Sequence, residues 1–529
     1  MMKYPIGIQS FEKLREGGFV YADKTALVYD LVTTGTVYFL SRPRRFGKSL
    51  LVSTLECYFR GRKELFEGLA IEALEQEWNE HPVFKIDFNG GKYSDPAALG
   101  LKLNAYVGKW EQIYGKDPLE QNIEDRFAGV LARAYQQTGH KAVVLIDEYD
   151  KPILDVLDTP QEDENRDILK AFYSTFKSTD DYTRFVFLTG VTKFSQVSVF
   201  SGFNQPDDIS MSARYEALCG ITEEELEYYF AEPITLMAKK YKHTIEEMKL
   251  VLKQQYNGYH FSDELTDIYN PFSLINAFRN NRIDDYWFRT GTPTYLQTLL
   301  QHNHEGINDL TGKYYEPKMF VDYKADVEKP LPMIYQSGYL TIKDYDIRRN
   351  RFLLDFPNNE VRGGFLTMIA SGYLKNKNEN ISTWISDAII LLEDGETATF
   401  RDSLTAFLAG IPYDAHPSLK KSEAATEKHF QYTFYLILRL LGGSGCILLT
   451  EKTQAVGRVD AILEFKDYVY IFEFKLDGSA TEALRQIEEK HYAEPYLNDP
   501  RRVFCIGVDF SSETMTVKEW KERQVHAPS

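Results

Sequence analysis

The chain has 529 residues, which at roughly 150 residues per domain predicts three or four domains, and its composition is 43% hydrophobic and 26% charged, as in globular proteins. A formal net charge of −17 excludes a surface that binds nucleic acid everywhere, because phosphate contacts need Lys and Arg, but it allows a local basic cleft. The four cysteines form no CxxC pair, no apolar h-region opens the chain, and no apolar run reaches the ~18 residues that span a membrane. We therefore expect a cytoplasmic protein with reduced thiols and no membrane partner.

The first element with evident chemistry is a predicted phosphate-binding loop. Residues 36–40, TVYFL, have the pattern of a short buried strand, and a helical pattern starts within SRPRRFGKSLL. Strand, loop and helix in this order are typical of a P-loop, whose backbone N–H groups bind phosphate at a helix N-terminus. We expect Lys48 to reach the β- and γ-phosphates of ATP and the Ser49 hydroxyl to bind Mg²⁺. The expected nucleotide-binding residues are Arg44, Arg45, Phe46, Gly47, Lys48, Ser49, Leu50 and Asp147.

This loop departs from the general pattern GxxxxGK[ST] at its first position, where Arg42 replaces glycine. For the tripeptide alone, a chance GKS at the start of a helix is an open alternative. A partner motif weakens that alternative: residues 142–148, AVVLIDE, are an apolar strand that ends in two acids, as expected of a Walker B strand. Asp147 would hold Mg²⁺ through water, and Glu148 would act as the catalytic residue that polarises the attacking water.

A third apolar strand, residues 185–188, ends at TGVTKFS. Thr189, Thr192 or Lys193 could sense the γ-phosphate from its tip, and a structural hydrogen bond is an equal alternative for each. The arginine finger is unassigned among Arg44, Arg45 and Arg214. A finger donated by a neighbouring subunit would make the protein a homo-oligomer.

The middle of the chain, residues 221–303, is predicted to be rich in helices, and ITEEEL opens it with a Thr cap and acids in the first turn. QSGYLTIKDYD and RNRFLLDFPNNEV then predict a hairpin, which together with the helices suggests a winged-helix-like module. Such modules often bind DNA, but the fold alone does not show it. A basic cluster at the turn, which a solvated hairpin tip explains equally well, is formed by Lys343, Arg348, Arg349 and Arg351. His260 and Trp287 are expected to be packing residues.

The C-terminal region places acids on two neighbouring strands. VGRVDAILEF carries Asp460, and YVYIFEFKL carries Glu473 and Lys475. Residues i and i+2 of a strand face the same side, so Glu473 and Lys475 point together, and a hairpin brings Asp460 alongside them. ExK alone is common, and a surface ion pair is its plain alternative. The predicted order around these strands is a helix at residues 423–441, then CILLTEK, the two acidic strands, the helix ATEALRQIEEKHY and the strand RVFCIGVDF.

These residue types suit Mg²⁺-dependent hydrolysis of phosphodiesters. Mg²⁺ prefers oxygen ligands and keeps several waters, so Asp460, Glu473 and the backbone carbonyl of Phe474 could supply one face of its shell. Lys475 could steady the attacking hydroxide and the charge that develops on the phosphate. Glu427, on the preceding helix, could complete the site or hold a second metal ion. Glu423, one turn earlier, is an alternative to Glu427.

Several segments together resemble a known family. GIQSFEKLREGGFVYADKT, LSRPRRFGKSLLVSTLECYF, LIDEYDKPI, TGVTKFSQVSVFSGFN and YNGYHF are similar to the AAA-ATPase-like family of bacterial proteins, which is commonly fused to a PD-(D/E)xK nuclease-superfamily domain. The resemblance covers nearly the whole chain. It implies that SRPRRFGKS is the family's own form of the loop and that Tyr21, Asp23 and Lys24 lie near the nucleotide. It also implies that Asp460 is the single acid, that residues 473–475 are the (D/E)xK element, and that Gln486 faces the catalytic site and orients it.

We therefore expect an α/β multidomain protein with a P-loop AAA-ATPase-like domain at residues 1–220, a helical lid with a winged-helix-like region at 221–375, and a restriction-endonuclease-like α/β domain of PD-(D/E)xK type at 376–529. The expected function is ATP binding and hydrolysis that gates Mg²⁺-dependent cleavage of nucleic acid, with DNA the preferred partner over RNA. The alternative is an ATP-driven switch or scaffold whose nuclease-like domain binds nucleic acid or protein without cutting. A transporter or kinase has no motif in its favour.

Overall fold

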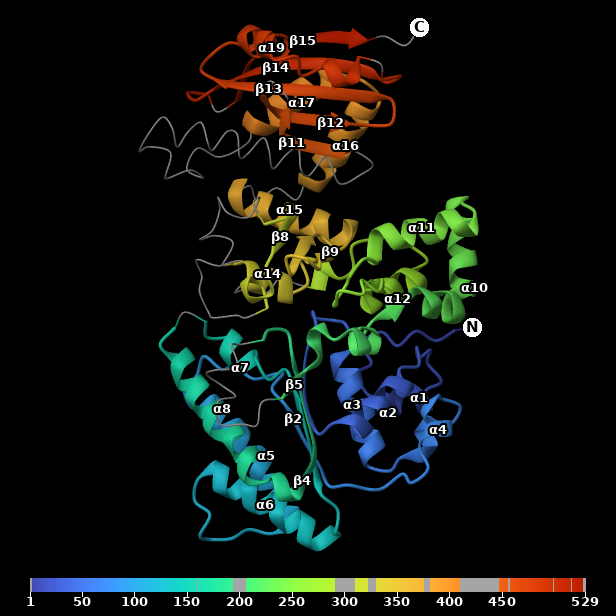
Figure 1. Ribbon diagram of the computed structural model, residues 1–529, viewed down its shortest axis with the longest axis vertical. Helices are drawn as coiled ribbons and strands as arrows, with labels where there is room; N and C mark the ends of the chain where they lie inside the picture. The colour runs from blue at the N-terminus through green and yellow to red at the C-terminus, as the bar shows by residue number, and fades with distance from the viewer. Residues whose placement is uncertain are drawn as a thin grey trace. The chain divides into compact units, whose positions relative to one another are not determined.

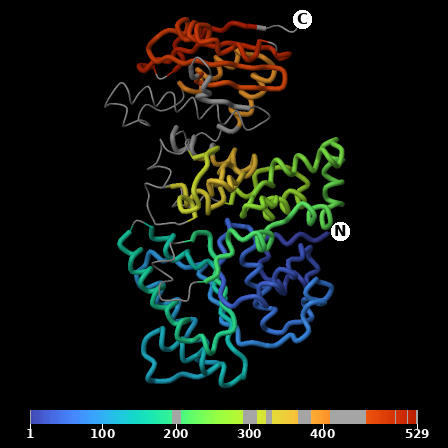
Figure 2. Tube along the Cα trace, viewed as in Figure 1, coloured from blue at the N-terminus to red at the C-terminus, as the bar shows by residue number. Residues whose placement is uncertain are grey.

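The structure, a computed structural model, describes residues 2–157, 159–193, 206–290, 310–321, 330–374, 381–409, 447–454, 457–497, 499–514 and 516–526. They belong to two compact units, Met1–Val361 and Arg362–Ser529. Figure 2 traces the chain through both units, from blue at the N-terminus to red at the C-terminus. A finer division of the first unit at residue 220 stays a prediction. None of the helices in these residues is long and apolar enough to cross a membrane.

The first unit is built on a parallel sheet with the strand order β2-β3-β4-β1-β5. Strand β3, which lies between β2 and β4, is buried at every residue, as expected for a parallel strand covered on both faces. The carboxyl ends of β3, β4 and β1 meet at one edge, where ligands bind in sheets of this type. The strands are β1 (Val37–Ser41), β2 (Val83–Asp87), β3 (Ala142–Asp147), β4 (Thr183–Gly190) and β5 (Asp207–Asp208).

Helices cover both faces of this sheet. Figure 1 shows the helices α1 to α4 on one side of the strands and α5, α6 and α8 on the other. Helix α3 begins directly after the predicted phosphate loop, as the strand–loop–helix pattern predicted. The helices are α1 (Phe11–Glu16), α2 (Thr25–Thr34), α3 (Lys48–Phe59), α4 (Ile71–Leu74), α5 (Ala98–Tyr114), α6 (Ile123–Thr138), α7 (Lys151–Leu154) and α8 (Gln161–Ser178).

A helical layer follows in the same unit. The Thr cap predicted at ITEEEL is confirmed: Thr222 and Glu225 form a reciprocal capping box at the start of α10, and a second box opens α11. The strand β6 just before α10 pairs with the strand β7 just before α12 in a small antiparallel sheet. The elements are α10 (Glu223–Tyr241), α11 (Ile245–Tyr256), α12 (Pro271–Asn280), β6 (Ile221–Thr222) and β7 (Ile268–Tyr269).

The predicted hairpin is confirmed as β9 (Thr341–Asp346) and β10 (Arg351–Asp355). A third strand that the sequence analysis missed, β8 (Lys313–Tyr315), pairs with β10, and α14 (Leu331–Gln336) precedes the hairpin. Lys343 does not belong to the basic tip, because its ammonium donates to the carbonyls of Gly258 and Pro357 at 2.8 and 2.9 Å. Burial lowers the pKa of Lys343 to about 8.

The second unit contains a mixed sheet with the order β11-β12-β13-β14-β15, in which only β13 and β14 are parallel. The predicted order of three strands, a helix and a strand is confirmed, whereas the last strand, β15, was not predicted. The helix expected at residues 423–441 lies outside the described residues. Helix α15 (Asn359–Leu374) begins in the first unit and continues into the second. The other elements of the second unit are α16 (Ile381–Glu393), α17 (Thr397–Ala409), β11 (Ile447–Gln454), β12 (Gly457–Glu464), β13 (Tyr468–Leu476), α19 (Ala480–Glu489), β14 (Arg502–Ser511) and β15 (Thr516–His526).

Alternate residues of β13 face different helices. Val469 and Ile471 pack in a core with Ile487 of α19, whereas the Tyr470 hydroxyl donates to the Leu392 carbonyl of α16 at 2.6 Å. Because side chains of a strand alternate between faces, Glu473 and Lys475 share the face that α19 covers. The period-2 prediction thus places both candidate site residues beneath one helix.

This helix approaches the sheet closely over Gly507 of β14. A Cβ built on Gly507 would lie 2.3 Å from the Ala480 carbonyl oxygen and 2.7 Å from the Leu484 nitrogen. Both contacts are with helix backbone, which has no flexible end that can move aside. The absence of a side chain at residue 507 therefore sets the distance between α19 and the sheet.

We predict that Gly507→Ala destabilises the second unit by about 1–3 kcal/mol, because the added methyl group overpacks this contact. Native-state hydrogen exchange of β14 amides measures the effect locally. Gly363→Ala is the matched control, since its Cβ would meet no atom within 4 Å. In an α-helix such as α15 that change should be neutral or slightly stabilising. Equal protection of β14 in the wild type and Gly507→Ala would contradict the packing argument.

Candidate nucleotide and metal sites

The predicted phosphate loop has the geometry of an anion-binding cradle. Gly47 takes the left-handed conformation, with φ of 96°, and caps the N-terminus of α3. Lys48 is only 4% exposed, and its ammonium donates to the carbonyls of Arg42 and Pro43 at 2.9 and 3.1 Å. The lysine therefore points into the concave side of the loop, where a nucleotide phosphate would compete with these two carbonyls.

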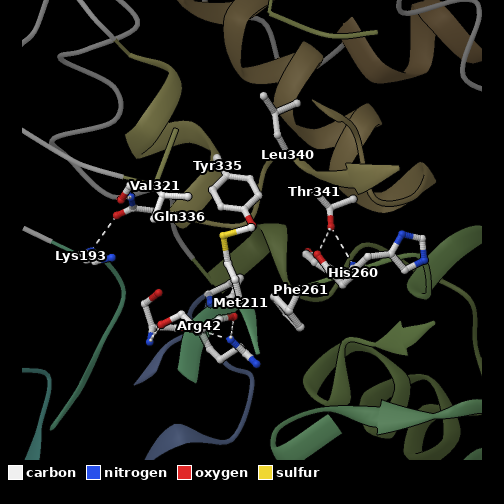
Figure 3. A pocket seen from close by; sticks show the side chains of 14 residues that line it. Arg42, Lys193, Met211, His260, Phe261, Val321, Tyr335, Gln336, Leu340 and Thr341 are labelled. Carbon is white, nitrogen blue, oxygen red and sulfur yellow. Dashed lines mark hydrogen bonds between the residues drawn. The ribbon is translucent and has the colours of Figure 1, made fainter. Parts of the chain in front are cut away.

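Arg42 explains how the loop forms without its first glycine. Its guanidinium is buried and donates to the Ser41 and Ser210 carbonyls at 2.9 and 2.7 Å. It also stacks 4.0 Å from the centroid of the Phe261 ring. Burial lowers the pKa of Arg42. The arginine thus ties the base of the loop to two neighbouring segments, and it lines a small pocket that is partly open to solvent (Figure 3).

The outer side of the loop is enclosed by the layers that follow the sheet. The indole N–H of Trp287 donates to the Arg44 carbonyl at 2.9 Å, so this residue does more than the packing role expected for it. The Phe46 side chain is buried against aromatic rings, so only the backbone N–H of this residue could contact a phosphate. The remaining contacts pair Pro43 with the Gly338 backbone, Arg45 with the Phe272 ring at 5.2 Å, and Phe46 with Tyr259 and Phe261 at 4.7 and 5.6 Å.

The two predicted Mg²⁺ ligands of the nucleotide site lie together. Burial raises the pKa of Asp147 to about 6, and a hydrogen bond with the Ser49 hydroxyl opposes that rise. The Glu148 N–H donates to the Asp147 carboxylate at 3.1 Å, and Glu148 has a positive φ of 53°. A further acid that the sequence analysis missed, Asp87, ends β2 in register with Asp147. A carboxylate beside a hydroxyl at the end of a buried strand is a donor set that fits Mg²⁺.

The tip of β4 is held by another residue that was missed, Asp150. One oxygen of its fully buried carboxylate accepts hydrogen bonds from the Val191 and Thr192 N–H groups and from the Thr192 hydroxyl, at 2.7–2.9 Å. Burial raises the pKa of Asp150 to about 6. The sequence LIDEYD could have pointed to Asp150, because this residue is the third acid directly after the buried strand. Of the other sensor candidates, Thr189 donates to the Leu40 carbonyl at 2.9 Å and Lys193 pairs with Asp208 at 2.6 Å.

The other residues singled out for the nucleotide end make structural contacts. Lys24 pairs with Glu225 of α10, and Asp23 accepts hydrogen bonds from Thr25 and from the Ala70 N–H. Arg214 pairs with Asp30 at an exposed position. The choice of an arginine finger among Arg44, Arg45 and Arg214 stays open.

In the second unit, Asp460 and Glu473 come together as predicted from the strands. The antiparallel register pairs Ala461 with Phe472, which sets Asp460 opposite Glu473. The Asp460 carboxylate accepts the Phe474 N–H at 2.8 Å. Two carboxylates of neighbouring strands and the backbone of residue 474 therefore lie within one small region of the sheet.

Gln486 of α19 connects the acid to the base. Its amide oxygen accepts a hydrogen bond from the Lys475 ammonium at 2.7 Å, and its amide nitrogen donates to the Glu473 carboxylate. One side chain thus uses its donor and its acceptor to hold both residues of the ExK element. The structure places Asp460, Glu473, Lys475 and Gln486 in one cluster, whereas Glu427 lies outside the described residues.

The electrostatics of this cluster favour a cation. Glu473 is 3% exposed, and one of its carboxylate oxygens has no hydrogen-bond partner in the described structure. Burial, followed by the charge of Asp460, raises the pKa of Glu473 to about 8. Among the described residues no group of three or more His, Cys, Asp or Glu side chains is placed to hold a metal ion. The two carboxylates and a backbone carbonyl still fit Mg²⁺, because that ion keeps several waters in its shell.

Comparisons with known proteins cover most of the chain. Residues 5–200 match the family model for predicted AAA-ATPases, and residues 425–520 match that of the PD-(D/E)XK nuclease superfamily. An "uncharacterized protein in vnfD 5'region" of Azotobacter chroococcum mcd 1 is 35% identical over 521 residues, covering 97% of this chain and 98% of that protein. The ORC1 protein of Aeropyrum pernix in complex with DNA aligns with 66% of this chain and 93% of its own, at 10% identity and a TM-score of 0.25, a likeness too low to bear on function.

We predict that Glu473→Gln stabilises the metal-free protein at pH 8 relative to the wild type. The raised pKa of Glu473 means that its neutral form is favoured in the folded state, so its stabilising contribution is complete below about pH 4.5 and is lost as the pH rises through about 8. Thermal unfolding in EDTA from pH 4 to 9 measures this effect. The two proteins should converge near pH 4, and Mg²⁺ should raise the melting temperature of the wild type more than that of Glu473→Gln. A difference that does not change with pH would contradict the prediction.

Proposed function

Because the chain belongs to the AAA-ATPase-like family and carries a PD-(D/E)XK nuclease-superfamily domain, we propose that it is an ATP-gated, Mg²⁺-dependent nuclease. Nucleic acid, with DNA preferred over RNA, is the proposed substrate. The observation that carries this proposal is the cluster of Asp460, Glu473, Lys475 and Gln486, because all four described members of the predicted site converge.

At the nucleotide site, each residue has a role that follows from its position. The backbone N–H groups of residues 45–50 would bind the phosphates, and the ammonium of Lys48 would leave its two loop carbonyls for the β- and γ-phosphates. Ser49 and Asp147 would hold Mg²⁺, which neutralises charge between the phosphates. Glu148, one residue beyond Asp147, would orient the attacking water. Asp150 would keep the β4 tip in place beside the γ-phosphate.

At the nuclease site, Asp460, Glu473 and the Phe474 carbonyl would hold Mg²⁺, and Glu427 is the proposed further ligand. Bound there, Mg²⁺ would supply Lewis-acid polarisation of the phosphate. The Lys475 ammonium, held by Gln486, would stabilise the negative charge that develops as water adds to phosphorus and the P–O bond breaks. The hydrogen bond from Gln486 would keep the Glu473 carboxylate turned toward the ion.

Gating has a physical route within the first unit. The Arg44 carbonyl of the loop accepts the Trp287 indole N–H, and the Trp287 backbone N–H donates to the Glu360 carboxylate at 2.6 Å. Glu360 is buried and is the second residue of α15, the helix that continues past Val361 into the second unit. A change in loop conformation on nucleotide binding would therefore reach the start of α15 through two hydrogen bonds. The β4 tip has a similar link, since the Lys193 N–H donates to Gln336 at 2.7 Å.

The second candidate is a switch or scaffold that uses the nuclease-like domain only for binding. The net charge of −17 favours it, because a processive nucleic-acid enzyme gains from positive surface. Under this alternative, the nucleotide would still control assembly. Phosphodiester cleavage separates the two candidates.

We expect purified protein to cleave DNA panels faster than RNA panels in Mg²⁺, with ATP increasing the rate. Asp460→Ala and Lys475→Ala should each lower the rate by about 100-fold or more, because each removes a charge that acts in the transition state. Lys48→Ala should abolish only the response to ATP. Asp467→Ala, at an exposed position in the turn of the same hairpin, is the control and should cleave normally. Undiminished cleavage by both active-site variants, or none by the wild type, would favour the scaffold.

Trp287→Phe tests the gating route, because phenylalanine keeps an aromatic ring but cannot donate to the Arg44 carbonyl. We predict that this variant binds ATP and cleaves at the basal rate but loses an ATP response of about fivefold or more. The matched control is Trp78→Phe, since the Trp78 indole nitrogen has no hydrogen-bond partner in the described structure. Cleavage rates with and without ATP provide the measurement. An intact ATP response in Trp287→Phe would rule out this route.

A further inference from the structure

The turn between β13 and α19, residues 477–479, joins the two halves of the nuclease site. Lys475 lies just before the turn, and Gln486 lies on the helix after it. The hydrogen bond between them, at 2.7 Å, tolerates little displacement of α19 relative to the strand. The residues that fix this turn therefore also set how Glu473, Gln486 and Lys475 contact one another.

Three carboxylates fix the turn and the start of α19: two accept backbone N–H groups of the turn and the helix, and the third, which belongs to the turn, accepts a backbone N–H from residue 512. Asp509 accepts the Gly478 N–H at 2.8 Å, and Glu519 accepts the Ala480 N–H at 2.9 Å. Asp477, within the turn, accepts the Ser512 N–H at 3.0 Å. Asp509 and Glu519 come from β14 and β15, beyond the sequence motif, and β15 was not predicted at all.

Asp509 is the buried member of this set. It is 0% exposed and lies in register with Lys475 on the adjacent parallel strand. Its second oxygen lies 3.3 Å from the Lys518 ammonium of β15, a side chain that is half exposed. Burying a carboxylate costs free energy because the group loses its hydration, and at Asp509 the hydrogen bond from Gly478 and the ion pair with Lys518 offset part of that cost.

The turn also packs directly on the lysine. A Cβ built on Gly478 would lie 3.2 Å from Cβ and 3.6 Å from Cγ of Lys475, and 3.8 Å from Oδ1 of Asp509. The Gly478 backbone therefore covers the aliphatic stem of Lys475 while Asp509 holds it there. No larger residue fits at 478 without a shift of the turn or of the lysine.

We propose that Asp509 is a positioning residue of the nuclease site: by holding Gly478 against the stem of Lys475, it fixes the path from β13 into α19 and so the Lys475–Gln486–Glu473 contacts. Asp509 acts through the turn and touches neither substrate nor metal. The effect of Asp509 on catalysis rests on the proposed function. The way in which Asp509 holds Gly478 against Lys475, which we call the clamp, can be tested without measuring cleavage.

Three variants test this role. Asp509→Ala removes the acceptor for the Gly478 N–H, whereas Asp509→Asn keeps an acceptor oxygen of the same shape and removes only the charge. Gly478→Ala leaves Asp509 intact and displaces the turn at an exposed position, where folding is not at risk. Asp499→Ala is the control, because Asp499 is a hydrogen-bonded carboxylate of the same unit that contacts Arg501 away from the site.

We expect Asp509→Ala to lower kcat for cleavage by about 100-fold with KM nearly unchanged, since a misplacement of catalytic groups by about 1 Å costs roughly this much. Gly478→Ala should lower kcat by a smaller factor, because its Cβ requires only a slight shift of the turn or of Lys475. Asp509→Asn and Asp499→Ala should keep kcat within about threefold of wild type. Two results would overturn the proposal. One is unchanged kcat in both displacing variants, and the other is a loss in Asp509→Asn as large as in Asp509→Ala, which would assign the effect to charge.

Amide hydrogen exchange of residues 474–486, measured without substrate or metal, keeps the proposal separate from the proposed function. Exchange at residues 478–480 should speed up in Asp509→Ala and stay near wild type in Asp509→Asn. If the wild type cleaves neither DNA nor RNA while this exchange pattern holds, the nuclease function fails and the clamp stands. Equal exchange in all variants would overturn the clamp whether or not cleavage occurs.

Discussion

The C-terminal site depends on the repulsion between two carboxyl groups that the sheet holds opposite each other. Asp460 and Glu473 lie on neighbouring antiparallel strands, and Glu473 is too buried for water to screen the pair. Burial and, after it, the charge of Asp460 raise the pKa of Glu473 to about 8, so a proton or a cation relieves the repulsion between the two groups. Lys475 and Gln486 complete the cluster, and the turn held by Asp509 keeps them within reach. A divalent ion would satisfy the carboxylates better than a proton does at neutral pH.

The nucleotide site follows a similar design, in which distant residues hold a short motif in place. Arg42 replaces the usual glycine and fastens the base of the loop to backbone carbonyls, while aromatic rings enclose its outer side. Trp287 contacts the loop and Gln336 contacts the β4 tip, the two elements that would surround the γ-phosphate in the proposed nucleotide site. A loop so enclosed on its outer side is poorly able to change shape alone. That constraint makes coupling between the nucleotide and the neighbouring layers a physical expectation.

The sequence predicted features set by local periodicity and failed where distant contacts decide. Strand alternation placed Glu473 and Lys475 on one face, and the strand–loop–helix pattern placed Lys48 and Ser49 at the start of a helix. Trp287 was expected only to pack, and Asp150 and Asp509 were missed, because the roles of all three come from partners far away in the chain. Lys343 was wrongly assigned to the basic hairpin tip for the same reason, since its ammonium binds the backbone carbonyls of Gly258 and Pro357 instead. The polar, alternating sequence of β15 gave little apolar signal, although that strand supplies Lys518 and Glu519.

Anomalous diffraction from crystals grown with Mn²⁺ as a substitute for Mg²⁺ tests directly whether Asp460 and Glu473 hold a divalent ion. We expect an anomalous peak within coordination distance of carboxylate oxygens of both residues, with Lys475 still hydrogen-bonded to Gln486. The absence of manganese between these carboxylates at saturating concentration, while Ser49 and Asp147 bind it, would contradict the nuclease assignment and leave the nucleotide site in place.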